Sequence, residues 1–199
     1  MHSWNIKNQR LHKIIYMEGK MKGIISIFIT IIICACASIG SYYTYGVDTI
    51  EDEFDGYKII RMHGNYLPDN AIIPTSSLLF NPQIFIDRDG NKKYQFYAEY
   101  TDKDWLFIRE GASLILLIDG DRVELNGYGS NNHREVVEGY TGPVIKEIAI
   151  FEASKELFEK IAKANTVKLK IKGAARSIER ELSSKHINNI MMFVRDYVK

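Results

Sequence analysis

The chain is poor in cysteine. Its 199 residues contain two cysteines, Cys34 and Cys36, and both lie in one apolar stretch near the N-terminus. The rest of the chain therefore cannot form a disulfide bond, supply a thiolate nucleophile or build a cysteine metal site. A body of about 150 residues buries roughly 68–70% of its unfolded surface, so it can fold without such cross-links.

The chain also lacks a large excess of charge of one sign, since its formal net charge is +1. Residues 1–37 hold five basic groups and one acid, which leaves 21 basic and 24 acidic residues, a net charge of −3, for residues 38–199. A mildly acidic body has no general electrostatic attraction for nucleic acids. We therefore expect no nucleic-acid partner.

One long segment, residues 23–47, contains no charged side chain, and its centre is strongly apolar. Lys20 and Lys22 precede this apolar core and small residues follow it, which is the order of a secretory signal. The core has about 14 residues, fewer than the roughly 20 that a spanning helix needs. We predict that residues 1–37 are an export leader, and that residues 1–20 are an over-extended start or, alternatively, a cytoplasmic tail.

Three fates are open for this leader. Residues 33–36 resemble the bacterial lipobox, in which the last cysteine becomes lipid-modified, although Cys34 occupies a position that usually holds Ala, Ser or Thr. The sequence Ala35-Cys36-Ala37 equally fits the small-x-small site of ordinary signal peptidase, and an uncleaved anchor is the third alternative. We favour lipidation at Cys36, which predicts a membrane-anchored envelope protein outside the cytoplasm, with a secreted or periplasmic protein as the alternative.

Residues 38–53 are expected to form a tether, and residues 54–199 a single domain. Alternating apolar and polar side chains predict strands at residues 57–62, 84–87, 93–100, 105–108, 114–118, 122–125, 146–151, 167–172 and 176–182. The stretch that contains Pro68, Pro74 and Pro82 is expected to be irregular because proline donates no backbone hydrogen bond. Residues 127–143, which are rich in glycine and asparagine, are expected to form the longest loop.

Two amphipathic helices complete the domain. Ser154 is a suitable N-cap for the first, and the second is expected to begin at Ser183 or Ser184. A two-residue turn at residues 173–174 would place Lys168 opposite Glu179. The predicted fold class is α+β, a mostly antiparallel meander sheet with two amphipathic helices packed on it in a two-layer arrangement.

The long loop holds the weak catalytic candidates, Ser130, His133 and Glu135. They would act as a hydrolase if the loop brought them together, but loop polarity is the better interpretation because a triad is defined by geometry. The five histidines form no cluster with metal-ligand spacing, so we predict no metal site and no cofactor. Asp87, Asp89 and their neighbours are typical of a hairpin turn rather than of a calcium loop.

Two groups of residues are binding candidates. Lys168, Lys170 and Lys172 alternate along one strand and could bind a polyanion or phospholipid headgroups, although such lysines are normally the solvated side of a strand. Tyr97 points away from its aromatic neighbours and, if exposed, would suggest a platform for a peptide or glycan. Packing in the core is the alternative for Tyr97.

From residue 148 to residue 198 the order is strand, helix, hairpin, helix, with the segments FEASKELFEKIAKANTVKLKIKG and SIERELSSKHINNIMMFV. This quarter of the chain resembles the C-terminal part of small, uncharacterised bacterial secreted proteins and lipoproteins, some with the layout of invasion-associated proteins. The resemblance implies an envelope setting and no reaction type. We predict a non-enzymatic envelope protein that binds a protein, peptide or glycan, with a surface hydrolase using residues 127–135 as the alternative and a structural subunit as a third.

Overall fold

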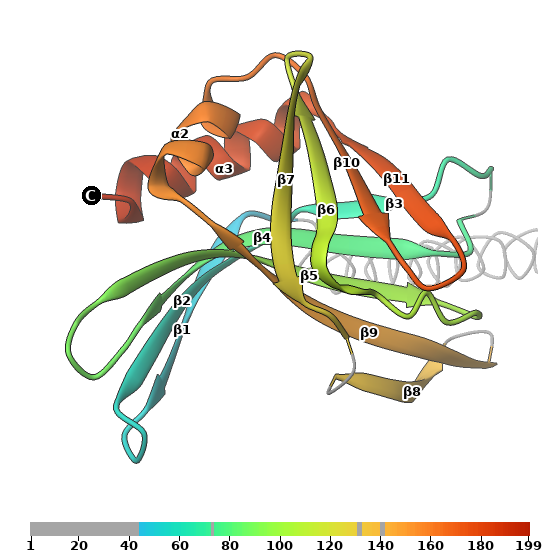
Figure 1. Cartoon of the computed structure of the whole chain (residues 1–199), viewed down its shortest axis with the longest axis horizontal. Helices are drawn as coiled ribbons and strands as arrows, with labels where there is room; N and C mark the ends of the chain where they lie inside the picture. The colour runs from blue at the N-terminus through green and yellow to red at the C-terminus, as the bar shows by residue number, and fades with distance from the viewer. Residues whose placement is uncertain (1–43, 73, 131–132, 140–141) are drawn as a thin grey trace, which may run out of the picture. The chain divides into compact units, whose positions relative to one another are not determined.

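The structure is a computed structural model that describes residues 44–72, 74–130, 133–139 and 142–199, all within one compact unit, Tyr42–Lys199. The described part is an α+β domain dominated by one antiparallel sheet of eleven strands, with two helices (Figure 1). This confirms the predicted α+β class and the mostly antiparallel pairing. The elements are β1 Gly46–Asp52, β2 Tyr57–His63, β3 Tyr66–Pro68, β4 Ser77–Ile86, β5 Lys92–Asp102, β6 Glu110–Ile118, β7 Asp121–Tyr128, β8 Arg134–Gly139, β9 Gly142–Ala153, α2 Lys155–Ala162, β10 Val167–Lys172, β11 Ser177–Leu182 and α3 Ser184–Tyr197.

The strand order departs from a simple meander. It runs β1-β2-β4-β5-β9-β7-β6-β10-β11, with β3 paired to β4 and β8 to β9. Strand β9 lies between β5 and β7 because it pairs with β5 along most of its length and meets β7 at Gly127↔Phe151. A Cβ atom at Gly127 would lie 2.6 Å from the Phe151 ring, so only glycine allows this approach.

The domain differs from the sequence prediction in several places. Residues 134–139, expected to lie in the long loop at 127–143, form strand β8. Residues 46–52, expected to be part of a tether, form strand β1 and pair in register with β2. Pro82, expected in an irregular stretch, lies within β4 opposite Phe96. Strand β4 tolerates this proline because β3 pairs only up to Leu79 and β2 begins to pair at Gln83, so the missing N–H falls between them.

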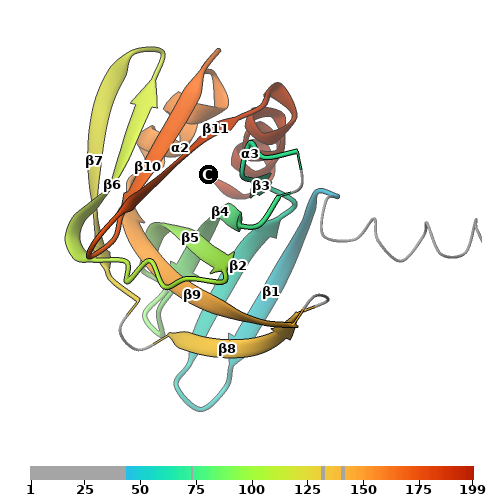
Figure 2. The ribbon, with the colours of Figure 1, turned by 90° about the vertical axis from the view of Figure 1, so that its right-hand side faces the viewer.

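The two helices are as predicted, and α3 begins after the first of the two serines proposed. Ser154 and Ser183 are the N-caps, and the hydroxyl of each accepts a backbone N–H three residues later. Figures 1 and 2 show α2 and α3 side by side at one end of the strands. Phe158 of α2 and Phe193 of α3 are fully buried, and the Phe158 ring lies 4.9 Å from that of Phe96. The core therefore joins both helices to the sheet.

The β10–β11 hairpin has a different register from the predicted one. Lys168 pairs with Glu181 and Lys170 with Glu179, a shift of two residues, because the turn is longer than two residues and closes with a hydrogen bond from the Gly173 N–H to the Arg176 carbonyl. Lys168 thus still faces a glutamate, as predicted, although a different one.

Within the described ranges, no helix has the length and apolar character that crossing a bilayer requires.

Candidate functional site

The most distinctive surface of the domain is the segment that joins β5 to β6, residues 103–109, called here the aromatic loop. Side chains alternate along it, with Leu106 and Ile108 buried, Phe107 exposed and Trp105 half-buried. The Trp105 and Phe107 rings stack with centroids 5.8 Å apart and planes 25° apart. Phe107 is 41% exposed, which is unusual for a phenylalanine held in an ordered segment.

Phe107 also has an unfavourable backbone conformation. Its φ is +54°, in the left-handed region that side chains other than glycine rarely adopt. Such a conformation costs roughly 1–2 kcal/mol, and residues of this kind gather at ligand clamps and other functional sites. The loop is therefore held in this shape by its surroundings.

The main restraint is the carboxylate of Glu147, on β9, which is fully buried. It accepts the backbone N–H groups of three successive residues, at 2.5 Å from Leu106, 2.9 Å from Phe107 and 3.1 Å from Ile108. The Ser130 hydroxyl donates a fourth hydrogen bond to it, at 2.6 Å. Successive N–H groups that converge on an anion form a nest, and here the anion belongs to the protein itself.

A second buried carboxylate, Asp102, holds the start of the loop. It accepts hydrogen bonds from the hydroxyl of Tyr100 and, at 2.9 Å, from the guanidinium of Arg176. Burial opposes the ionisation of Asp102, but these hydrogen bonds outweigh it and hold its pKa below the ordinary value. Burial raises the pKa of Tyr100, and its bond to Asp102 raises it further, so the phenol remains a donor.

The β10–β11 turn closes on the same loop. The Arg176 guanidinium donates to the Asp104 carbonyl at 3.0 Å, and the Ala174 N–H donates to the Leu106 carbonyl at 3.1 Å. A Cβ atom on Gly173 would lie 2.0 Å from that carbonyl oxygen, so the close approach requires glycine. The aromatic loop is thus bonded to β9, to the end of β5 and to the β10–β11 turn.

Arg134, the first residue of β8, packs against this surface and is half-buried. Its guanidinium carbon lies 4.7 Å from the centre of the Phe107 ring, a cation–π contact. Its Nε–H donates to the Ser130 hydroxyl at 3.1 Å, and Nε lies 3.9 Å from the Glu147 carboxylate. We call Trp105, Phe107 and Arg134 the aromatic cluster.

The predicted catalytic residues do not converge as a triad would. Ser130 is fully buried, and its hydroxyl donates to Glu147 rather than to a histidine. His133 is exposed and contacts Ser130 through its backbone N–H, which donates to the Ser130 carbonyl at 3.0 Å. Glu135 is on the surface, in an ion pair with Lys146 at 2.9 Å.

Tyr97 does not meet the condition that made it a binding candidate, because it is only 9% exposed. The Arg61 guanidinium carbon lies over its ring, 3.9 Å from the centroid, and its hydroxyl donates to Glu99 at 2.6 Å. Burial, assisted by Glu99, raises the pKa of Tyr97. A peptide or glycan would find this ring already covered.

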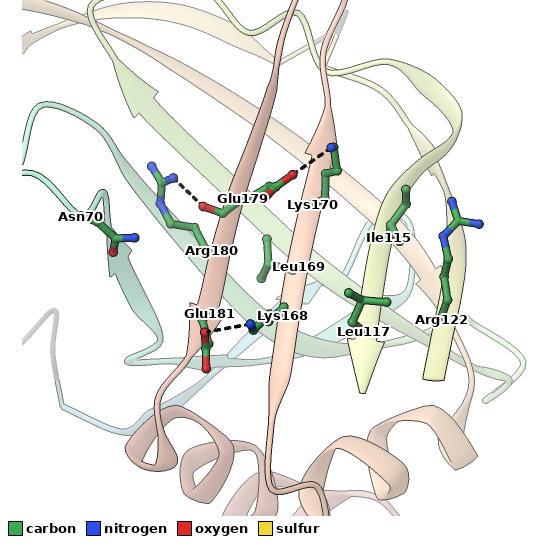
Figure 3. A pocket seen from close by; sticks show the side chains of 10 residues that line it. All are labelled: Asn70, Ile115, Leu117, Arg122, Lys168, Leu169, Lys170, Glu179, Arg180 and Glu181. Carbon is green, nitrogen blue, oxygen red and sulfur yellow. Dashed lines mark hydrogen bonds and ion pairs between the residues drawn. The ribbon is translucent and has the colours of Figure 1, made fainter. Parts of the chain in front are cut away.

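The predicted lysine face lies on the outer side of β11, β10, β6 and β7, where an open groove encloses about 590 Å³ (Figure 3). Lys170 is 2.8 Å from Glu179 and Lys168 is 3.7 Å from Glu181, while Lys172 donates to the Ala112 carbonyl at 3.1 Å. The aliphatic side chains of β6 separate these pairs from the arginine on β7. Because each lysine is bonded within the domain, the geometry gives the polyanion interpretation no support.

Two other predictions concern the lipidation site and metal binding. Cys36, the proposed lipidation site, lies outside the described residues. In the ranges that are described, no three His, Cys, Asp or Glu side chains are grouped in a way that could hold a metal ion.

The sequence showed the aromatic loop only in part. Its sequence predicted a short strand at residues 105–108, without indicating which side chains would be buried. What differs is the hydrogen bonding, since the N–H groups of these residues bond to a side chain instead of a neighbouring strand. Glu147 is 39–41 residues away in the chain, and no local pattern distinguishes it from a surface glutamate of an alternating strand.

Comparisons with protein-family models, with curated proteins and with solved structures gave no match to this chain.

Proposed function

We propose that this protein is a cell-envelope lipoprotein whose domain is a non-enzymatic binding module, and that it binds a protein or peptide partner through the aromatic cluster. One observation carries the proposal. The aromatic loop is held by two buried carboxylates in a conformation unfavourable for Phe107, and the result is an exposed Phe107 ring stacked on the half-buried ring of Trp105.

The chemistry of the cluster supports binding rather than catalysis. Tryptophan and arginine are the side chains most enriched at the centres of protein interfaces, together with tyrosine. Rings that are fixed before association lose little conformational entropy on binding. Ser130, by contrast, is buried and bonded to a carboxylate, so nothing in this geometry favours the hydrolase alternative.

The envelope setting rests on the leader sequence and its cysteine. Lipidation at Cys36 would place the domain outside the cytoplasm, and secretion or a periplasmic location is the alternative. Mass spectrometry of the mature N-terminus, combined with palmitate labelling, tests the lipidation of Cys36 in the wild type and in Cys36→Ser. We expect a lipid-modified Cys36 in the wild type and loss of the label in the variant. An intact, unprocessed chain in the cytosol would contradict the proposal.

The finer layering is also part of the proposal. We propose that α2 and α3 form one layer and the sheet the other. The supporting observation is that Phe158 packs edge-on against Tyr94 and Phe96 of β5, and also contacts Phe193 of α3.

The binding proposal is tested by photo-crosslinking in cells. A photoreactive phenylalanine analogue replaces Phe107 in one strain and Phe54, which is 96% exposed in the β1–β2 turn, in a control strain. We expect a discrete crosslinked product from position 107 and none from position 54. Adding Trp105→Ala should remove that product. The same pattern of products from both positions, or none from either, would contradict the proposal.

A further inference from the structure

Strand β8 is an open edge of the sheet, and Figures 1 and 2 show it on the outer side of β9. It pairs with β9 from Arg134↔Glu147 to Gly139↔Gly142, and no other strand in the described part of the chain pairs with it. The outward backbone N–H and C=O groups of such an edge form a template for another strand.

The side chains of β8 include three charges of mixed sign, Arg134, Glu135 and Glu138, which can pair with a second strand instead of repelling it. The strand contains neither lysine nor proline, the residues that most often prevent edge pairing. Val136 is 64% exposed, the largest exposure of any apolar residue within a strand of the domain. Arg134, Val136 and Glu138 share one face because successive side chains alternate.

The two ends of the main strand order are better protected. Strand β1 carries three acidic side chains, Asp48, Glu51 and Asp52, and no basic one, so two copies of it would repel each other. Strand β11 is held against the β3 segment, since the Arg180 guanidinium donates to the Leu67 carbonyl at 3.4 Å and to the Ser76 hydroxyl at 2.8 Å. Of these three edges, β8 is the one suited to pairing.

We infer that β8 pairs antiparallel with β8 of a second copy of this chain, with Val136 on the two-fold axis. In this register Val136 faces its own equivalent, and Arg134 of each copy faces Glu138 of the other. Opposite charges in directly opposed pairs stabilise a sheet. A shift of two residues in one direction places Glu135 opposite its own equivalent, and a shift of two in the other direction opposes no charges of opposite sign. Charge and register therefore select one isologous arrangement.

The dimer has a consequence for the aromatic cluster. The two-fold axis is perpendicular to the plane of the sheet. It continues the sheet from one copy to the other and keeps equivalent faces on the same side. Because Arg134 belongs both to β8 and to the cluster, the two clusters would flank the axis on one surface. This inference goes beyond the proposed function and stands even if the aromatic cluster binds no partner.

Disulfide trapping tests the register. Opposed Cα atoms in an antiparallel pair lie about 4.5 or 5.5 Å apart, within the range of about 4.4–6.8 Å for a disulfide bond. Val136→Cys is introduced into the full chain, which also carries Cys34→Ser and Cys36→Ser, and the protein is purified in detergent. Phe54→Cys in the same background is the control. Under mild oxidation, we expect the Val136→Cys chain to form a disulfide-linked dimer at least about tenfold faster than the Phe54→Cys control. Equal rates would overturn the inference.

Analytical ultracentrifugation tests the charge pairing by measuring self-association of the full chain that carries Cys34→Ser and Cys36→Ser. A six-residue edge is a small interface, so association should be weak and visible at tens of micromolar or above. Glu138→Arg places like charges opposite each other twice and should raise the apparent dissociation constant about tenfold or more. Glu135→Arg changes charge equally but faces valine in the proposed register, and should have much less effect. A chain that is monomeric at all concentrations, or equal effects of the two substitutions, would overturn the inference.

Discussion

At the scale of single residues, the most unusual group is the carboxylate of Glu147. It is fully buried, yet it accepts four hydrogen bonds, three from backbone N–H groups and one from a hydroxyl. A buried charge is tolerated when its hydrogen-bonding capacity is filled in this way. The shape of the aromatic loop therefore depends on one side chain that the loop does not contain.

Removal of this charge should destabilise the domain. In Glu147→Gln the amide oxygen can still accept, but the amide nitrogen would direct its own hydrogens toward a backbone N–H. We expect a loss of about 2–4 kcal/mol in the free energy of unfolding, since hydrogen bonds to a charged group contribute about 1.5–3 kcal/mol each. Urea denaturation of the wild type and of Glu147→Gln measures this loss of stability. Glu135→Gln, in an exposed ion pair, is the control and should change stability by less than about 1 kcal/mol.

At the scale of elements, helix α3 is fixed by its first turn. The Ser183 hydroxyl accepts the His186 N–H, while the Ser183 N–H donates to Nδ1 of His186 at 3.2 Å, a capping box. The amide of Asn65 donates to the His186 carbonyl at 3.2 Å, and the amide of Asn189 donates to Asn65 at 3.0 Å. The helix is thus joined to the sheet at the point where it begins.

This cap should make stability depend on pH. Burial lowers the pKa of His186 below its ordinary value and Lys185 lowers it further, while the Tyr66 carbonyl acts in the opposite direction. The unfolded chain gains this proton near pH 6.5 and the folded chain only at lower pH. The free energy of unfolding should therefore fall as pH decreases below about 6.5. We expect a lower urea midpoint at pH 5.5 than at pH 7.5, and a smaller difference in His186→Gln.

His133 supplies the matched control, because it is an exposed histidine of the same domain. His133→Gln should leave the difference between the two urea midpoints unchanged. An equal difference in the wild type and in His186→Gln would show that the cap does not sense pH in this range.

The β10–β11 turn is the second element with a specific requirement. Gly173→Ala would place a methyl group against the backbone of Leu106, and forced overlap in a packed region costs about 1–3 kcal/mol. We expect this loss in chemical denaturation, together with a changed fluorescence of Trp105. Gly120→Ala is a useful comparison because nothing lies within 4 Å of the added atom there, although its φ is +94°. It should leave the fluorescence of Trp105 unchanged.

Elements were predictable where the signal is local. The N-caps Ser154 and Ser183 and the hairpin around Asp87, whose carboxylate accepts the Asp89 and Asn91 N–H groups, depend on residues close in sequence. The place of β9 between β5 and β7 depends on contacts between distant segments, and so does the aromatic loop. The β10–β11 register was missed by two residues because a two-residue shift keeps every side chain on its face.

At the scale of the whole domain, one hydrophobic core joins the sheet to both helices. Phe158→Ala should reduce the free energy of unfolding by about 3–5 kcal/mol, as large-to-small changes of buried aromatic residues do. Because there is one core, the unfolding curves from Trp105 fluorescence and from far-ultraviolet circular dichroism should coincide in the wild type and the variant. Separate transitions would show that the aromatic loop unfolds independently.

The restraints on the aromatic loop come late in the chain. The carboxylate of Asp102 is bonded by Arg176, which lies 74 residues further along the chain. Leu106 is in contact with the turn that contains Gly173. During synthesis, which begins at the N-terminus, Trp105 and Phe107 are thus made long before the segments that give them their shape. The aromatic loop therefore reaches its final conformation only when nearly the entire chain has been made.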